Sequence, residues 1–345
     1  MNIYEQDIFS QAEDMRRALQ HYRSKEYPLA LAEAATRPFK HIIFTGMGSS
    51  YFACYNAVTI LRNKGIRCYA VTASQLLHYE LDSIGADSLL VIVSQSGRSG
   101  EVADLVEKIK RRCYIVGLCN DPESPLGLGS NLMLNLQISP EEAVSTRTYL
   151  APLMLLHILA KVFTGAWTEE SYAPIGELIA VLEDTVNQFE TLSMDLERFL
   201  EMPPYVVLIG RGYSLATVDS GALFTKEVAK YPSIPFDSGQ FRHGPYEMLG
   251  ENFSAFIFAS RDQCYEMQFR LAKEIAGKGG RAVLVTDGTE KTQDNMLVIN
   301  QRYPVPELAA MINIVPVQAF SNYIARKKGL KAGTFLYSSK ITQVQ

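Results

Sequence analysis

Unbroken runs of apolar residues recur along this chain and end in segments rich in glycine and serine. The run Leu89–Val93 contains no polar residue, as expected for a strand buried on both faces of a parallel sheet. Similar runs, each followed by a segment of helical character, predict strands in the first half at residues 41–44, 67–71, 89–93, 114–118 and 132–136. Strands that alternate with helices predict a parallel sheet covered by helices on both faces.

The second half repeats this pattern after a long helical region at residues 145–200. Its predicted strands are residues 205–209, 253–258 and 281–286. The first strand of each half ends in a Gly-x-Gly segment, Gly46–Gly48 and Gly210–Gly212, and a helix follows. We therefore predict an α/β fold of two tandem doubly wound, flavodoxin-like subdomains, whose parallel sheets are flanked by helices.

The segment Ser94–Glu101 follows a buried strand and precedes a predicted helix that starts near Val102. Its three serines supply short hydrogen-bond donors, and its two glycines let the backbone come close to a ligand. The free N–H groups and the dipole of the helix start favour an anion. Two interpretations stay open, a phosphate-binding loop and a serine-rich turn with an ordinary N-cap.

The loop after the first predicted strand does not match several common anion sites. Gly46-Met47-Gly48 begins like a dinucleotide-binding motif, but Tyr51 stands where the third glycine belongs. The chain has no G-x-x-x-x-G-K-[ST] P-loop and no G-x-S-x-G nucleophile elbow. The two serine-lined loops of the first half therefore favour one compact phosphate group.

Side chains suited to acid–base and nucleophilic chemistry lie in the second half. Glu227 lies in a helix predicted over residues 215–229, and His243 precedes a Gly-Pro pair that restricts its backbone. We interpret Glu227 and His243 as an acid–base pair; the alternatives are a surface carboxylate and a structural histidine. Lys340 lies near the C-terminus, where it is either solvated or docked and able to act as a nucleophile.

Composition favours a soluble globular protein with a small-molecule partner. The 345 residues are 47% hydrophobic and 20% charged, which suits two domains of ordinary size. A net charge of −4 argues against a nucleic-acid surface. The polar N-terminus predicts no signal peptide, and no uninterrupted apolar run reaches the roughly 18 residues of a membrane span. Five cysteines without CxxC spacing predict reduced thiols, no metal site and a cytoplasmic location.

Together these motifs resemble those of the sugar isomerase (SIS) domain phosphosugar proteins. The resemblance is chiefly to the isomerase half of glucosamine-6-phosphate synthase and to its stand-alone relatives, the deaminases and the fructosamine- or glucoselysine-6-phosphate deglycases. It covers nearly the whole chain, from about residue 20 onward, as two tandem SIS subdomains. The glutaminase domain of the synthase has no counterpart in this sequence, which argues against a glutamine-dependent amidotransferase.

The resemblance implies a set of phosphosugar-binding residues. The family's first motif resembles Gly48-Ser49-Ser50, its S-Q-S-G-x-[ST] loop is matched by residues 94–99, and its next binding segment resembles Ser145-Thr146. The binding residues implied in this way are Gly48, Ser49, Ser50, Ser94, Gln95, Ser96, Ser99, Ser145 and Thr146.

The resemblance also implies three catalytic residues. Glu227 matches the glutamate that moves a proton between C1 and C2, and His243 matches a histidine that the partner subunit donates for ring opening. Lys340 matches the near-terminal lysine that forms a Schiff base with the open-chain sugar. One position departs from the family, since Phe224 stands where the synthase has a further lysine.

The expected activity is cleavage of the C–N bond of an amino-sugar 6-phosphate. A sugar–amino acid 6-phosphate deglycase is the first hypothesis, and a glucosamine-6-phosphate-type deaminase or isomerase is the second. A non-catalytic phosphosugar-binding regulator is the alternative from another class. No metal or redox cofactor is required. The expected partners are a small amino-sugar phosphate and further copies of the chain, in a homodimer or higher homo-oligomer with shared active sites, without nucleic acid or membrane.

We expect the chain to comprise five segments. An N-terminal helical segment precedes the first SIS subdomain, connecting helices lead to the second, and a tail contributes to the active site. Their predicted limits are residues 1–35, 36–165, 166–200, 201–330 and 331–345.

Overall fold

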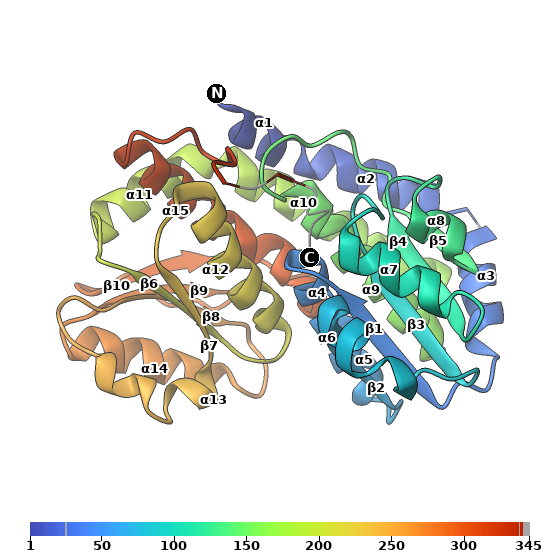
Figure 1. Cartoon of the computed structure of the whole chain (residues 1–345). Helices are drawn as coiled ribbons and strands as arrows, with labels where there is room; N and C mark the ends of the chain where they lie inside the picture. Colours follow the sequence, from blue (N-terminus) through green and yellow to red (C-terminus); the bar gives the residue numbers. More distant parts are fainter. Residues whose placement is uncertain (25, 338, 341–345) are drawn as a thin grey trace. The chain divides into compact units, whose positions relative to one another are not determined.

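The computed structural model describes residues 1–24, 26–337 and 339–340, which form two compact units. The first unit comprises Ser10–Gly176 and Phe335–Gln345, and the second comprises Met1–Phe9 and Glu177–Thr334. Each contains a five-stranded parallel sheet (Figure 1), which confirms the predicted α/β fold with two doubly wound subdomains. The segment limits drawn from the sequence stay a prediction, and residues 338 and 341–345 of the predicted tail lie outside the described residues.

The sheet of the first unit has the strand order β2-β1-β3-β4-β5, with every pairing parallel. The strands are β1 (His41–Gly46), β2 (Cys68–Thr72), β3 (Ser88–Val93), β4 (Tyr114–Cys119) and β5 (Leu132–Asn135). The helices are α2 (Gln11–Tyr22), α3 (Glu26–Ala35), α4 (Ser49–Phe52), α5 (Cys54–Arg62), α6 (Ala73–Tyr79), α7 (Gly100–Ile109), α8 (Pro125–Gly129) and α9 (Arg147–Phe163).

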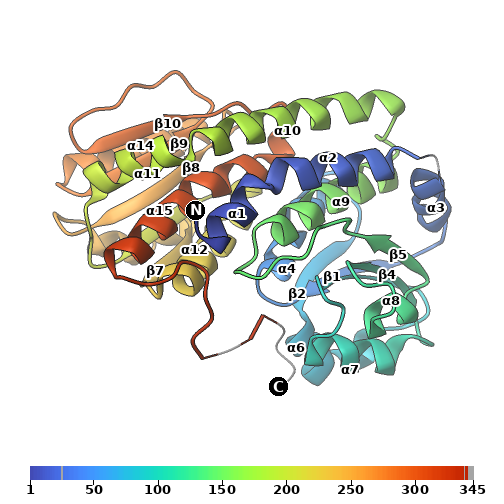
Figure 2. The same ribbon diagram turned by 90° about the horizontal axis from the view of Figure 1, so that it is seen from above.

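Helices cover both faces of this sheet because its strands carry apolar residues on both sides. Ile43, Leu90 and Ile92 point to one face and pack against α6, α7 and α8. Helices α2, α3 and α5 pack on α9, which lies on the opposite face from α6 and α7 (Figure 2). Each parallel crossover therefore places a helix on the sheet, as a doubly wound fold requires.

The second unit repeats the same strand order, β7-β6-β8-β9-β10. Its strands are β6 (Val206–Gly210), β7 (Ser233–Asp237), β8 (Ser254–Ala259), β9 (Arg281–Thr286) and β10 (Met296–Asn300). Its helices are α1 (Ile3–Phe9), α11 (Phe189–Leu200), α12 (Leu215–Ala229), α13 (Ser238–Phe241), α14 (Tyr265–Gly277) and α15 (Ala310–Lys327), while α10 (Tyr172–Asn187) contains the boundary between the units. The identical order supports the predicted internal repeat.

Every predicted strand is present, within two residues at each end. The apolar runs of the sequence did not predict β7 and β10, which lie at the two edges of the second sheet. Edge strands are only partly buried, so they need no continuous apolar run, and Pro235 interrupts the pattern of β7. The predicted helical region 145–200 is divided into α9, α10 and α11, and the predicted N-terminal helical segment, residues 1–35, contains α1, α2 and α3.

One long helix in each unit is buried almost all round. Residues 147–160 of α9 and 310–325 of α15 are all buried, and both helices contain an internal proline. A helix without a polar face lacks the 3.6-residue periodicity, which is why α15 was missed. Among the described residues, Pro306–Lys327 is the one helix that is long and apolar enough to cross a membrane. Polar residues interrupt it, so it is not an uninterrupted apolar run. Its 18-residue apolar stretch is fully buried within the protein.

The cysteines are free thiols, and Cys54, Cys68 and Cys119 are buried while Cys113 and Cys264 are partly exposed. Burial raises the pKa of the Cys68 and Cys113 thiols to about 11. These thiols stay protonated near neutral pH, so they are poor nucleophiles and poor metal ligands.

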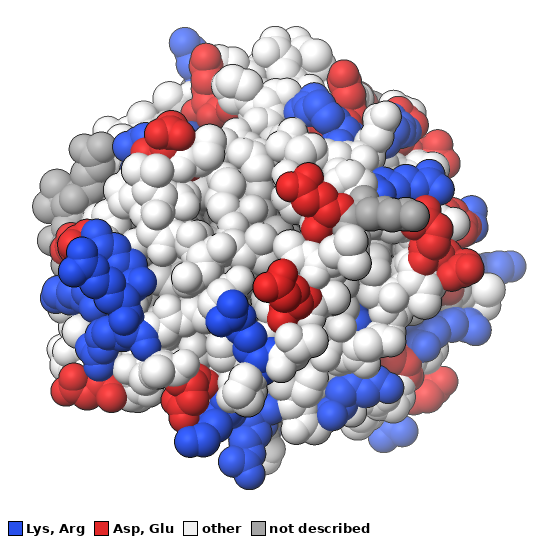
Figure 3. Space-filling view, turned by 90° about the vertical axis from the view of Figure 1, so that its right-hand side faces the viewer, with Lys and Arg blue, Asp and Glu red and all other residues white. Residues whose placement is uncertain are grey.

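Charged side chains of both signs are interspersed over the face drawn in Figure 3. Surface ion pairs of the first unit include Lys40 with Asp87 at 2.9 Å and Lys110 with Glu107 at 2.6 Å. Exposed pairs of this kind contribute little to stability. The expectation that the chain binds no nucleic acid stays a prediction.

We expect Gly46→Ala to lower the free energy of unfolding by about 1–3 kcal/mol, measured by urea denaturation. A Cβ at Gly46 would lie 2.7 Å from the backbone oxygen of Val93 and 3.1 Å from backbone atoms of Ser50 and Tyr51, none of which is a flexible side chain. Gly176→Ala in α10 is the control, since a Cβ there meets nothing within 4 Å. This control is expected to stabilise by up to about 1 kcal/mol through helix propensity. Equal effects of the two substitutions would contradict the close approach at Gly46.

Candidate functional site

The two serine-rich loops of the first unit come together where the strand order reverses. β1 pairs with β2 on one side and with β3 on the other, and Gly46 at the end of β1 lies opposite Val93 at the end of β3. Crossovers from these two strands leave in opposite directions, which opens a crevice beyond their carboxyl ends. Gly48-Ser49-Ser50 and Ser94–Ser99 therefore start from neighbouring strand ends, as a compact phosphate site requires.

The loop at residues 94–99 is folded by its own serines. The Ser94 hydroxyl accepts a hydrogen bond from the Gly97 N–H at 3.2 Å and lies 3.4 Å from the Ser99 hydroxyl. The Ser96 hydroxyl accepts from the N–H of Arg98 at 3.1 Å. Ser99 is the N-cap of α7, yet its side chain makes no capping hydrogen bond. The first-turn N–H groups of α7 are thus not capped by the Ser99 side chain, and their dipole favours an anion beside it.

Contacts with the segment after β4 hold this loop in place. Arg98 donates two hydrogen bonds to Asp121, at 3.0 and 2.6 Å, and this guanidinium holds the pKa of the Asp121 carboxyl below its usual value. The Asn120 N–H donates to the Gln95 carbonyl at 2.9 Å. Gly97 has a φ of +64°, and a Cβ there would lie 2.1 Å from the Ser124 hydroxyl. The geometry therefore requires glycine at this position for two reasons, the backbone conformation and the contact.

The other predicted binding residues differ in accessibility. Ser49 and Ser50 are half-buried, and neither hydroxyl bonds to another described residue, so both are available to a ligand. Ser145 is also half-buried. Thr146 is fully buried, and its hydroxyl donates to Glu141 at 2.7 Å. In this structure the Thr146 side chain thus contributes to the protein's own hydrogen bonds.

Glu141 is a buried carboxylate that the sequence analysis missed. Its Oε1 accepts hydrogen bonds from the N–H groups of Thr146 and Arg147, both at 2.9 Å, where α9 begins. The Thr146 side chain makes no capping hydrogen bond to the helix. The Glu141 carboxylate, five residues before Thr146, caps the helix start instead. An acidic residue before a helix start is a recognised signal, but this separation of five residues is longer than the usual capping motifs. Only the folded loop brings the carboxylate to the helix.

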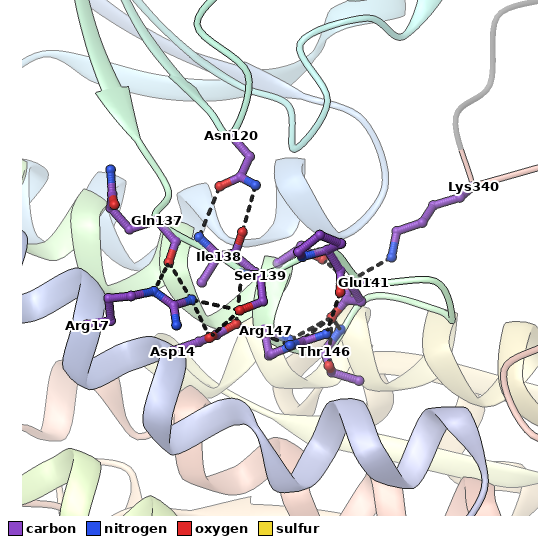
Figure 4. Close-up of polar contacts among 12 residues, drawn as sticks. Asp14, Arg17, Asn120, Gln137, Ile138, Ser139, Glu141, Thr146, Arg147 and Lys340 are labelled. Carbon is purple, nitrogen blue, oxygen red and sulfur yellow. Dashed lines mark hydrogen bonds and ion pairs between the residues drawn. The ribbon is translucent and has the colours of Figure 1, made fainter.

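Lys340 reaches the same carboxylate from the tail (Figure 4). Its Nζ donates to Glu141 Oε2 at 2.9 Å and to the Ala143 carbonyl at 2.8 Å. Its side chain is 21% exposed. Of the two interpretations of this lysine, solvated or docked, the structure has the docked one.

A second buried pair supports the segment that carries Glu141. Asp14 of α2 accepts hydrogen bonds from the N–H and the hydroxyl of Ser139, both at 3.1 Å, and pairs with Arg147 at 3.3 Å. Arg147 also donates to the Pro140 carbonyl at 3.0 Å. These contacts fix residues 139–141 between α2 and α9, as Figure 4 shows.

In the second unit, Glu227 lies on the last turn of α12 and is half-buried. The Lys230 amine donates to the Glu227 carbonyl at 2.6 Å and also to the Thr334 carbonyl. Burial lowers the pKa of Lys230; the Glu227 carboxylate opposes this shift and Lys328 reinforces it. Phe224 stands at the position of the family's further lysine and is fully buried. A lysine at this position would have to bury its charged amine, which costs free energy. Lys230 is instead the amine near Glu227.

His243 lies after α13, on the exposed surface of the second unit. Its backbone N–H donates to the Gln240 carbonyl at 2.9 Å, and its ring has no hydrogen bond to a described residue. Gly244 has a φ of +118°, a conformation that glycine adopts without strain. The predicted restricted corner is therefore present, and it presents the His243 ring outward. Among the described residues, no group of three or more His, Cys, Asp or Glu side chains could hold a metal ion.

We expect Gly97→Ala to destabilise the first unit more than Gly65→Ala, measured by denaturant unfolding. Both glycines have positive φ, so an alanine at either position adopts a strained backbone. A Cβ at Gly65 meets nothing within 4 Å, whereas one at Gly97 collides with Ser124. The difference isolates the contact and is expected to be about 1–3 kcal/mol. Equal destabilisation would show that the loop does not pack as described.

Comparison with known proteins finds a family model for part of this chain and relatives along most of it. The SIS domain model matches residues 37–162. The chain is 26% identical over 342 residues to a glutamine–fructose-6-phosphate aminotransferase [isomerizing] of Chlamydia pneumoniae, covering 94% of this chain and 56% of that protein. A protein of the same name from Aquifex aeolicus is 24% identical over 330 residues, covering 94% and 55%. The chain thus spans about half the length of the curated relatives it matches.

Solved structures show the same architecture. The C-terminal domain of glucosamine-fructose-6-phosphate aminotransferase from Francisella tularensis superposes with a TM-score of 0.82 at 21% identity, covering 95% of this chain and 96% of that one. Glucosamine-6-phosphate deaminase from Thermotoga maritima gives 0.79 at 20% identity, covering 99% and 100%. Residues 37–162 of this chain therefore belong to the SIS domain family, and its two subdomains have the tandem α/β SIS fold.

Proposed function

We propose that this chain cleaves the C–N bond of an amino-sugar 6-phosphate. The observation that carries the proposal is the convergence of two serine-rich loops at the β1/β3 crevice. The names of the relatives and of the structural neighbours refer to fructose 6-phosphate and glucosamine 6-phosphate, which supports a sugar phosphate as the ligand. A deglycase acting on a sugar–amino acid conjugate is the first candidate.

In this proposal the phosphate is bound far from the reacting carbons. A sugar 6-phosphate carries about two negative charges near neutral pH. Ser49, Ser50 and the loop at residues 94–99 would hold it with hydroxyl and backbone N–H donors. Binding this remote group supplies energy that orients the reacting end of the sugar.

Glu227, His243 and Lys340 carry the proposed chemistry. His243 assists opening of the sugar ring, and the Glu227 carboxylate takes a proton from one of C1 and C2 and returns it to the other. This transfer converts the amine-bearing carbon into an imine. Water adds to the imine carbon and the C–N bond breaks, which releases the amine and leaves a carbonyl on the hexose phosphate. Proton transfer by a positioned carboxylate contributes about 10²–10⁴-fold to such a rate.

A glucosamine-6-phosphate deaminase or isomerase is the second candidate. The docked position of Lys340 favours it, because an amine near the tail suits attack on an aldehyde at C1, with nitrogen on C2. A panel of 6-phosphorylated glucosamine, fructose–amino acid and glucose–amino acid conjugates separates the candidates by the amine and hexose phosphate released. Binding without turnover across this panel would favour the non-catalytic regulator.

We expect Glu227→Gln to abolish turnover of the best substrate while its affinity changes by less than a few-fold. The amide keeps the shape of the side chain but cannot accept the proton. Turnover is measured as released amine, and affinity by calorimetry. Glu266→Gln, at an exposed position of α14, is the control and is expected to keep full activity. Full activity in Glu227→Gln would refute the assigned role.

A homodimer with shared sites is part of the proposal, because the exposed His243 ring has no partner among the described residues of its own chain. We expect inactive Glu227→Gln and His243→Ala proteins to regain partial activity after subunit exchange, since one mixed site would be intact. Exchange is monitored by native mass spectrometry. Demonstrated exchange without any recovered activity would contradict shared sites.

A further inference from the structure

The Glu141 carboxylate is fully buried and both of its oxygens are occupied. Among the described residues its donors are the N–H and hydroxyl of Thr146, the N–H of Arg147, the hydroxyl of Thr148 and the amine of Lys340. A buried carboxylate is tolerated only when it is paired and hydrogen-bonded. These donors therefore stabilise the buried negative charge, and the carboxylate in turn fixes the positions of the donors.

The two oxygens have different partners. Oε1 accepts from three donors at the start of α9, where the positive end of the helix dipole also favours the negative charge. Oε2 accepts from Thr148 at 2.5 Å and from Lys340 at 2.9 Å. The tail lysine thus shares Oε2 with the Thr148 hydroxyl, whereas the backbone N–H groups at the start of α9 bond to Oε1.

Among the described residues, Lys340 is the cation within hydrogen-bond distance of Glu141. The guanidinium of Arg147 comes only to 3.9 Å and bonds instead to Asp14 and to the Pro140 carbonyl. Close to Lys340 in the tail, Leu336 is 55% exposed and Tyr337 is 97% exposed. The charged amine, rather than apolar burial of these two neighbours, accounts for the docking of this segment.

We infer that Glu141 is a positioning residue that docks Lys340 and keeps its amine unreactive until the ion pair opens. An ammonium that donates to Glu141 and to the Ala143 carbonyl has no free lone pair with which to attack a carbonyl carbon. Reaction requires the ammonium to release a proton to solvent. The lone pair then adds to the aldehyde carbon, the carbonyl oxygen leaves as water, and a C=N bond forms. This consequence for catalysis rests on the proposed function, whereas the docking does not.

Glu141→Gln separates the two oxygens chemically. The three donors at Oε1 require the amide oxygen on that side, so the amide NH₂ faces Thr148 and Lys340. An amide NH₂ facing the ammonium removes the anchor of the lysine but keeps the three hydrogen bonds at Oε1, and the Thr148 hydroxyl can turn to accept from the amide. Glu142→Gln is the matched control, because Glu142 is exposed and has no ion pair or hydrogen bond to a described residue.

The test is the rate of reductive methylation of each lysine by formaldehyde and cyanoborohydride, resolved by mass spectrometry in the substrate-free protein. We expect Lys340 to react more slowly than the exposed Lys331 in the wild type. In Glu141→Gln, Lys340 should react faster by on the order of tenfold, as expected for loss of a charge-assisted hydrogen bond. Lys331 in this variant, and both lysines in Glu142→Gln, should keep their wild-type rates.

Two results would overturn the inference. One is equal labelling of Lys340 and Lys331 in the wild type, a measurement that does not depend on whether any variant folds. The other is an unchanged Lys340 rate in folded Glu141→Gln. A purely structural role for Glu141 would speed many lysines together and lower the free energy of unfolding. Because no substrate is present, failure of the proposed function in the substrate panel would leave this result standing.

Discussion

Parallel strand pairing is the constraint on which the rest of this structure depends. Parallel strands need crossover connections, and these bring all carboxyl ends of a sheet to one edge. In the first unit the order β2-β1-β3-β4-β5 reverses direction at β1 and β3, so the loops after these two strands meet. Serines that are about 45 residues apart in the sequence thereby become neighbours. The strand order brings them together, and the local sequence of either loop does not.

Close backbone packing then fixes the shape of this edge. Gly46 lies against the Val93 carbonyl, and Gly97 lies against Ser124, so neither position has room for a Cβ. The Arg98–Asp121 pair and the Asn120–Gln95 hydrogen bond connect the serine loop to the segment after β4. A loop held at this many points is preorganised, and a preorganised loop loses less conformational entropy on binding an anion.

Buried charge has a different role in the same unit. Asp14, Arg147 and Glu141 lie between α2 and α9 in a connected network, which also includes Arg17 and the tail lysine Lys340. Replacing one member of such a network leaves an uncompensated charge, which is more costly than removing an exposed pair. The network therefore links the start of a core helix to the position of Lys340 in the tail.

The sequence by itself determined the fold class and the strands with continuous apolar runs, because buried strands have a local apolar pattern. It also indicated the candidate residues Ser94–Ser99, Glu227, His243 and Lys340, because their residue types and local motifs suit phosphate binding and acid–base chemistry. It did not reveal the edge strands β7 and β10, which are only partly buried and have no continuous apolar run. It also did not reveal α15, because a helix buried all round has no 3.6-residue periodicity. Only the tertiary structure decided that Thr146 is buried on Glu141 and that Lys340 is docked on the same carboxylate. Those contacts join residues up to 199 positions apart, and pairing over such a separation depends on the packing of the whole unit rather than on neighbouring residues.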